Sequence, residues 1–275
     1  MVSVFRIAPA LIFLILPFFP SFGQSPASSP WEQGLNSRVR LISGGLESGR
    51  RLAGIEIVLN SGFKTYWRTP GASGLPPRFD WSGSDNVSAV EIRWPAPTRH
   101  EDAGGVAYVY SHKVVLPVLV TPTDPARPVK LALSLDYGIC KDICIPAHAE
   151  LSATLSGEGL HGALLEEAMA QVPRPQPLGA KAELSVVDVR PSGQDEHAFE
   201  VAVRAPAGTR PDLFAEGPEN WYLSTSSAGD GNRFTVTVED KPKDAAGPVP
   251  VRLTLVADGK AVETEVNLDG GTRPR

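Results

Sequence analysis

Short segments in which apolar and polar residues alternate recur along most of this chain, and they constrain its fold more than any other feature. Examples are GIEIVLNSG (54–62), NVSAVEIRW (86–94), KVVLPVLVTP (113–122) and VKLALSLDYG (129–138). Side chains alternate between the two faces of a strand, so a period of two predicts half-buried strands. Clusters of Pro and Gly separate these segments. Many short strands joined by such turns are typical of antiparallel sandwiches.

One helical pattern interrupts the strands. HGALLEEAMAQV (161–172) repeats apolar residues at helical spacing, and PRPQP (173–177) ends it. Strand-like segments then resume, with a hairpin signal at Asp258-Gly259. We therefore predict an all-β protein of two β-sandwich domains joined by a short helix and a Pro-rich linker. The predicted boundaries are 33–157 for the first domain, 158–179 for the linker, 180–269 for the second domain and 270–275 for a tail.

The first 23 residues have the three-part pattern of a secretory signal peptide. Arg6 supplies an early positive charge, an apolar run follows, and small residues stand at Ser21 and Gly23. Two prolines interrupt the run before it reaches the roughly 20 apolar residues that span a membrane. We predict export and cleavage near Gly23, followed by a flexible tether at 24–32.

The charge balance bears on possible partners. The chain has 26 Lys and Arg residues against 31 Asp and Glu, a net charge of −5. It has no cluster of basic residues, and binding to nucleic acid depends on such clusters. The sequence therefore excludes nucleic acid as a partner.

Cys140 and Cys144 are the only two cysteines of the chain, and they lie in the segment CKDIC. As a structural staple the pair is weak, because closing so short a loop contributes only about 2 kcal/mol. A disulfide requires Cα atoms within about 7 Å, whereas a straight strand would place these two about 13 Å apart. An oxidised pair therefore demands a tight turn or hairpin tip at Lys141 and Asp142. A strained short loop is easier to reduce, which favours a bond that opens and closes.

Two other interpretations use the same thiols. Cys140, Cys144 and His148 form a Cys-x3-Cys-x3-His array that suits Cu(I) or zinc, although Pro146 disfavours the helix that would place them on one face. A binding module with a purely structural disulfide is the other. The pair is not a Cys-x-x-Cys motif and no βαβ pattern surrounds it, so a thioredoxin fold is excluded.

Four segments carry a resemblance to a known family. They are GFKTYWRTPGASGLPPRFDWSGSDNV (62–87), IRWPAPTRHEDAGG (92–105), YVYSHKVVLPV (108–118) and LDYGICKDICIP (135–146). Together they resemble the periplasmic N-terminal domain of the DsbD thiol:disulfide interchange proteins, and more closely its ScsB branch. The resemblance implies immunoglobulin-like sandwiches and a redox-active Cys140–Cys144 pair. It also implies a periplasmic component of protein-disulfide reduction that needs no cofactor.

The resemblance also implies supporting residues and partners. Arg99–Val106 would form a capping loop beside the cysteines, with Glu101 as a candidate for proton transfer. The aromatic residues expected nearby are Tyr66, Tyr108, Tyr110 and Tyr137. Electrons would come from a membrane thiol reductase supplied by another chain, because transmembrane and thioredoxin-like domains are not expected on this polypeptide. They would pass to a periplasmic thioredoxin-fold protein.

Overall fold

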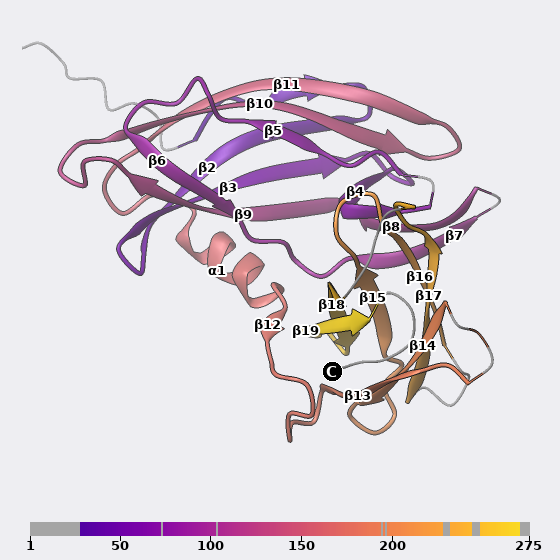
Figure 1. Ribbon diagram of the computed structural model, residues 1–275. Coiled ribbons are helices and arrows are strands. Elements are labelled where there is room, and N and C mark those ends of the chain that lie inside the picture. Colours follow the sequence, from indigo (N-terminus) through magenta and orange to yellow (C-terminus); the bar gives the residue numbers. More distant parts are fainter. Residues whose placement is uncertain are drawn as a thin grey trace, which may run out of the picture.

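The computed structural model describes residues 28–269 except 73, 103, 194, 196, 228–231 and 244–247. The predicted signal peptide, the first part of the tether and the tail at 270–275 lie outside the described residues. Within those residues the chain forms antiparallel sheets and one short helix, α1 (Gly162–Ala170) (Figure 1). The predicted all-β, immunoglobulin-like fold is confirmed.

The first sandwich consists of two facing sheets. One has the order β1 (Glu32–Gly34), β2 (Ser37–Glu47), β3 (Arg50–Leu59), β9 (Lys113–Pro122) and β6 (Val87–Ile92). The other has the order β11 (Cys144–Leu155), β10 (Val129–Cys140), β4 (Lys64–Gly71), β8 (Gly105–Ser111) and β7 (Thr98–Asp102), and β5 (Arg78–Asp80) also pairs with β10. Alternate residues of both sheets, such as Leu41, Ile55 and Leu131, are fully buried between them. The apolar positions of the alternating sequence segments are the ones buried in this core.

The second sandwich is smaller. One sheet has the order β12 (Arg174–Pro175), β19 (Lys260–Asp269), β18 (Pro248–Ala257) and β15 (Asp212–Glu216). The other has the order β13 (Ser185–Pro191), β14 (Ala198–Arg204), β17 (Arg233–Asp240) and β16 (Tyr222–Ser227). The predicted Asp258-Gly259 hairpin joins β18 to β19. Part of the Pro-rich run is itself a strand, because β12 pairs in parallel with β19.

The linker helix packs on the first sandwich. Leu165 and Ala168 of α1 are buried against Ile42, Leu52 and Val115, on the face of the β2–β3–β9 sheet that points away from the main core. A contact between the two domains comes from β15, whose Phe214 is buried with the core residues of the first sandwich. The two domains therefore share packed side chains.

A buried carboxylate lies on the sheet face that α1 covers. Glu56 on β3 is 4% exposed and accepts a hydrogen bond from Arg40 on β2 at 2.7 Å, and Lys113 on β9 lies 3.1 Å from it. Burial raises the pKa of Glu56, but the bonds to Arg40 and Lys113 outweigh burial and hold this pKa below its ordinary value of 4.5. The carboxylate therefore ties three strands together in its ionised form.

This arrangement predicts a specific loss of stability in acid. A carboxyl group whose pKa is lowered on folding stabilises the fold above its unfolded pKa, and this stabilisation is lost as pH falls through its folded pKa. Glu56→Gln should cost about 1 kcal/mol or more at neutral pH and should flatten the dependence of stability on pH below about 4.5. Urea unfolding between pH 7 and pH 3 measures both effects. An unchanged pH dependence in the variant would contradict the assignment.

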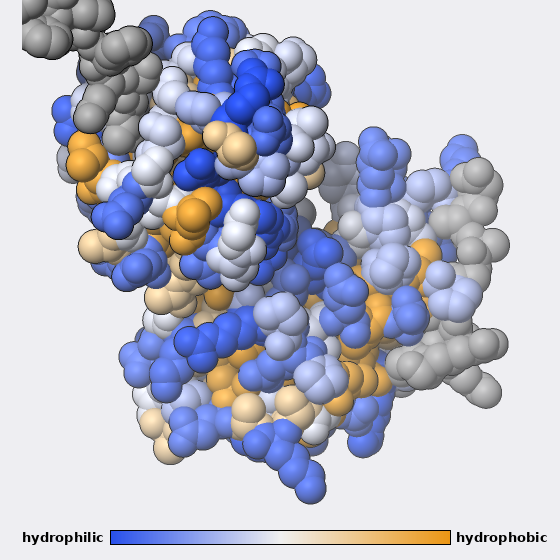
Figure 2. All heavy atoms as spheres, turned by 90° about the vertical axis from the view of Figure 1, so that its left-hand side faces the viewer, coloured by the Kyte–Doolittle hydropathy of each residue, from blue (hydrophilic) through white to orange (hydrophobic). Residues whose placement is uncertain are grey.

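Hydrophilic residues predominate on the face shown in Figure 2, and hydrophobic residues appear there in smaller groups between them. None of the described helical residues forms a segment long and apolar enough to cross a membrane.

Candidate functional site

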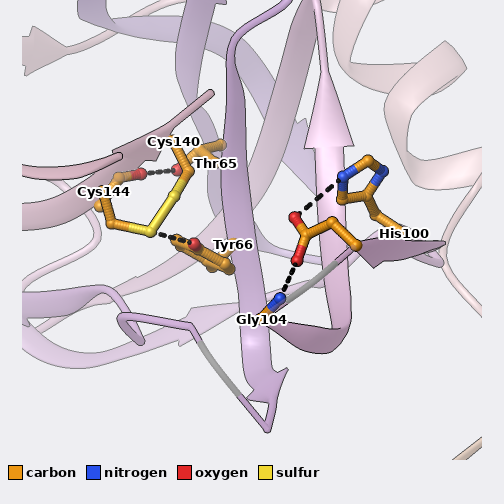
Figure 3. The surroundings of a disulfide bond; sticks show 8 residues. Thr65, Tyr66, His100, Gly104, Cys140 and Cys144 are labelled. Atoms are coloured by element: carbon orange, nitrogen blue, oxygen red, sulfur yellow. Dashed lines mark hydrogen bonds and ion pairs between the residues drawn. A yellow bond between two sulfur atoms is a disulfide. The ribbon is translucent and has the colours of Figure 1, made fainter. Parts of the chain in front are cut away.

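The two cysteines form a disulfide at the tip of the β10–β11 hairpin. Cys140 ends β10, Cys144 begins β11, and the two are direct cross-strand partners whose Cα atoms lie 4.2 Å apart. Lys141, Asp142 and Ile143 make the turn between them. The structure thus confirms the hairpin tip that we expect for an oxidised pair. Figure 3 shows the bond beside β4, with Thr65 and Tyr66 next to it.

The two sulfur-bearing residues differ in exposure. Cys140 is 8% exposed and belongs to a small buried cluster with Tyr66, Ala107 and Val109. Cys144 is exposed, and the neighbouring Ile143 is 76% exposed. A molecule approaching from solvent therefore meets Cys144 first.

The pairing register decides which side chains share a face with the disulfide. Cys140 is the partner of Lys64, Tyr66 of Val109, and Ala107 of His100. Since cross-strand partners point to the same side of a sheet, these residues and Asp102 all lie on the outer face. With the disulfide they line a pocket of about 500 Å³.

Tyr66 makes the one side-chain hydrogen bond to the disulfide among the described residues. Its hydroxyl lies 2.9 Å from the Cys144 Sγ (Figure 3). Burial raises the pKa of Tyr66, and the carboxylate of Asp102 raises it further. The phenol therefore keeps its proton at neutral pH and can donate it to the sulfur.

The predicted capping loop is a β-hairpin built from β7 and β8. Across the pocket from the disulfide, His100 Nε2 lies 3.3 Å from Asp102 Oδ2, and the Gly104 N–H donates to Asp102 Oδ1 at 2.8 Å (Figure 3). Glu101 is exposed and does not line the pocket. The alternation of a strand turns it away from the side that His100 and Asp102 face.

The other three predicted aromatic residues occupy the interior of the first sandwich. Tyr108 is 2% exposed and stacks edge to face on Phe214, with ring centres 4.9 Å apart. The Tyr110 hydroxyl donates to the Pro95 carbonyl at 2.6 Å, and the Tyr137 hydroxyl bonds to Ser37 at 2.8 Å. Of the four tyrosines, only Tyr66 is brought to the disulfide.

The proposed metal array is not assembled. His148 Nδ1 lies 2.8 Å from Asp136, and Nε2 lies 2.9 Å from Glu150, so carboxylates occupy both ring nitrogens. The hydrogen bond to Asp136, and to a smaller extent the one to Glu150, raises the pKa of His148. Across the part of the chain that the structure describes, no three His, Cys, Asp or Glu side chains are grouped to hold a metal ion.

Sequence reasoning missed His100 and Asp102. Both stand beside Glu101 in the segment HED, and the strand period alone shows that they face opposite to it. Which of the two faces carries the disulfide depends on the register between β10, β4 and β8. No pattern within HED carries that information.

The comparisons with known proteins agree with this geometry. Residues 41–156 match the family model described as thiol:disulfide interchange protein DsbD, N-terminal. None of the curated proteins matches the chain.

Among solved structures, the N-terminal periplasmic domain of ScsB from Proteus mirabilis is 21% identical with a TM-score of 0.68, covering 90% of this chain and 100% of that one. A conserved domain protein from Bacillus anthracis is 9% identical, covering 92% of this chain and 93% of that one. Its TM-score of 0.23 is too low to indicate a shared fold. The ScsB likeness shows a shared fold that extends over both sandwiches. Residues 41–156 of this chain therefore form a domain of the DsbD/ScsB N-terminal type.

Proposed function

We propose that this protein is exported to the periplasm and exchanges disulfides with other proteins through Cys144. The observation that carries the proposal is the asymmetry of the disulfide, in which Cys144 is exposed and Cys140 is 8% exposed. A weak staple at a hairpin tip with one exposed cysteine suits exchange better than stabilisation.

The exchange has two steps. A partner thiolate attacks the Cys144 Sγ, the bond between the two cysteines breaks, and Cys140 leaves as a thiolate that takes a proton from water. The partner's second thiolate then attacks the partner's first sulfur, which is bound to Cys144 in the mixed disulfide, and Cys144 leaves as a thiolate. The partner dithiol is oxidised to a disulfide and the Cys140–Cys144 pair is reduced.

The same steps in reverse pass the electrons on. The reduced Cys144 attacks the disulfide of a second protein, and Cys140 resolves the mixed disulfide. We expect a membrane thiol reductase on another chain as the electron source and a periplasmic thioredoxin-fold protein as the acceptor.

Trapping tests the proposal. In Cys140→Ala the resolving thiol is absent, so mixed disulfides between Cys144 and the two partner classes should accumulate in the periplasm. The matched control is Cys144→Ala, which should trap far less because Cys140 is covered. If neither variant yields a mixed disulfide, exchange is not the function.

Tyr66 is expected to favour the thiolate of Cys144 by donating its hydroxyl. A hydrogen bond to a charged group contributes about 1.5 kcal/mol or more, so Tyr66→Phe should lower the thiolate population about tenfold. A thiol of higher pKa gives a more nucleophilic thiolate, and this offsets about half of the tenfold loss on a logarithmic scale. Alkylation of reduced Cys144 by iodoacetamide at pH 7 should therefore slow about threefold.

Tyr137→Phe is the matched control for Tyr66→Phe, because the Tyr137 hydroxyl bonds to Ser37 in the interior. It should leave the alkylation rate unchanged. Equal rates in the two variants would show that the Tyr66 hydroxyl does not act on the sulfur.

A further inference from the structure

The β7–β8 hairpin is what covers Cys140. Ala107 and Val109 of β8 pack with Tyr66 on the buried cysteine, and no residue of that cluster belongs to the second sandwich. If the hairpin moved away, Cys140 would lose the cover of Ala107 and Val109 and would become more open to attack. The selectivity of the disulfide therefore depends on how firmly this hairpin is held.

The sheet to which the β7–β8 hairpin belongs holds β7, its outer strand, only weakly. β7 is the last strand of that sheet, so β8 alone pairs with it among the described strands. The pairing of β8 with β4 is interrupted between Tyr66 and Gly71, and resumes at Ala107. Edge strands with broken ladders open most readily, unless another part of the molecule anchors them.

Arg99 of β7 supplies that anchor from the second sandwich. Its guanidinium donates to Asp212 with distances of 2.8 and 3.1 Å, to the Leu213 carbonyl at 2.9 Å and to the Thr225 hydroxyl at 2.6 Å. It also lies 5.6 Å from the ring centre of Tyr108. The Arg99 side chain is 17% exposed and that of Asp212 is 32% exposed, so this charge-assisted pair is partly sheltered from water.

The alternation of β7 links this anchor to the pocket. Arg99 points toward the second sandwich, and its neighbour His100 therefore points toward the disulfide. Because consecutive side chains of a strand lie on opposite faces, holding Arg99 on one face also holds His100 on the other. Figure 1 shows β7 and β8 between the rest of the first sandwich and the strands β16 and β17.

We propose that the second sandwich determines which sulfur is attacked, because its bonds to Arg99 hold the β7–β8 hairpin over Cys140 and leave Cys144 open. Arg99 is thus a positioning residue, and Asp212 is its main partner. The inference rests on the proposed exchange function and gives the second sandwich a role in it.

Glutathione mapping on the full mature chain tests the inference. Glutathione thiolate attacks one sulfur of the oxidised pair and forms a mixed disulfide there, while the other cysteine leaves as a thiolate that N-ethylmaleimide then alkylates. Trypsin cleaves after Lys141, so the two cysteines fall in different peptides whose masses show where glutathione is bound.

In the unmodified protein, glutathione should be found on Cys144. In Asp212→Asn, which keeps the shape of the side chain, the share on Cys140 should rise about tenfold, as expected for the loss of one charge-assisted anchor. Arg99→Lys keeps the charge but loses the fork of donors, and it should shift the share in the same direction.

Glu216→Gln is the matched control. Glu216 accepts two hydrogen bonds from Arg68 of β4 at 2.8 and 2.6 Å across the same domain interface, but β4 is outside the hairpin. This variant should leave the mapping unchanged. An equal shift in Glu216→Gln, or none in both Asp212→Asn and Arg99→Lys, would overturn the inference. No reaction with glutathione in any variant would instead overturn the exchange function itself.

Discussion

Alanine in place of Phe214 is expected to lower the free energy of unfolding by about 3–5 kcal/mol, the range for a fully buried aromatic residue. Phe214 is 1% exposed, and its ring centre lies 5.9 Å from that of Trp67 and 4.9 Å from that of Tyr108. It belongs to the second sandwich but completes the core of the first. Its loss should therefore weaken both domains and the contact between them.

Urea unfolding followed by tryptophan fluorescence measures the effect. Phe234→Ala is the matched control, because Phe234 is 2% exposed and lies within the core of the second sandwich alone. We expect Phe214→Ala to shift the unfolding of both sandwiches, and Phe234→Ala to shift mainly that of the second. A loss below about 1 kcal/mol in Phe214→Ala would contradict the shared core.

The second large effect concerns the cysteines. After reduction, the single thiol left in Cys140→Ala should react with an aromatic disulfide reagent about tenfold or more faster than the thiol left in Cys144→Ala. The reason is access, because exchange needs a thiolate that the other sulfur can reach. Cys144 is exposed, whereas Tyr66, Ala107 and Val109 surround Cys140.

The coloured leaving thiolate of the reagent gives the rate directly. Urea-unfolded samples of both variants are the control, because unfolding removes the cover and should make the two rates similar. Equal rates in the folded variants, or a faster reaction of Cys140, would contradict the assignment of Cys144 as the entry point.

The local features of this fold could be predicted from the sequence. Alternation in segments such as 113–122 and 129–138 is a property of single strands, and both segments are strands of the first sandwich. The requirement that Cys140 and Cys144 meet at a hairpin tip follows from the reach of a disulfide alone. These expectations needed no knowledge of which strands lie side by side.

The composition of the site depends on strand register, which the sequence does not specify locally. Tyr108 and Tyr110 stand near the predicted cap in the sequence, yet the pairing of β4 with β8 turns both toward the core. The pairing of β7 with β8 then places His100 and Asp102, and not Glu101, on the side of the pocket. A shift of one residue in that pairing would exchange the two sets.

Contacts between domains are equally remote from local patterns. Arg68 reads as an ordinary solvated strand residue, and Arg99 lies at the start of the expected capping loop; nothing in either segment predicts a partner in the second sandwich. The structure pairs them with Glu216 and Asp212, more than a hundred positions away along the chain. Such pairs arise from how the two sandwiches pack against each other, and no period within either segment encodes them.

The reduction potential of the Cys140–Cys144 pair tests the central claim most directly. The protein is equilibrated in buffers of known thiol–disulfide potential and quenched by alkylation, and the oxidised fraction is read by mass. A pair that exchanges in the periplasm should be half reduced at a potential above about −300 mV. A midpoint well below about −300 mV would mark a structural disulfide and contradict the proposed function.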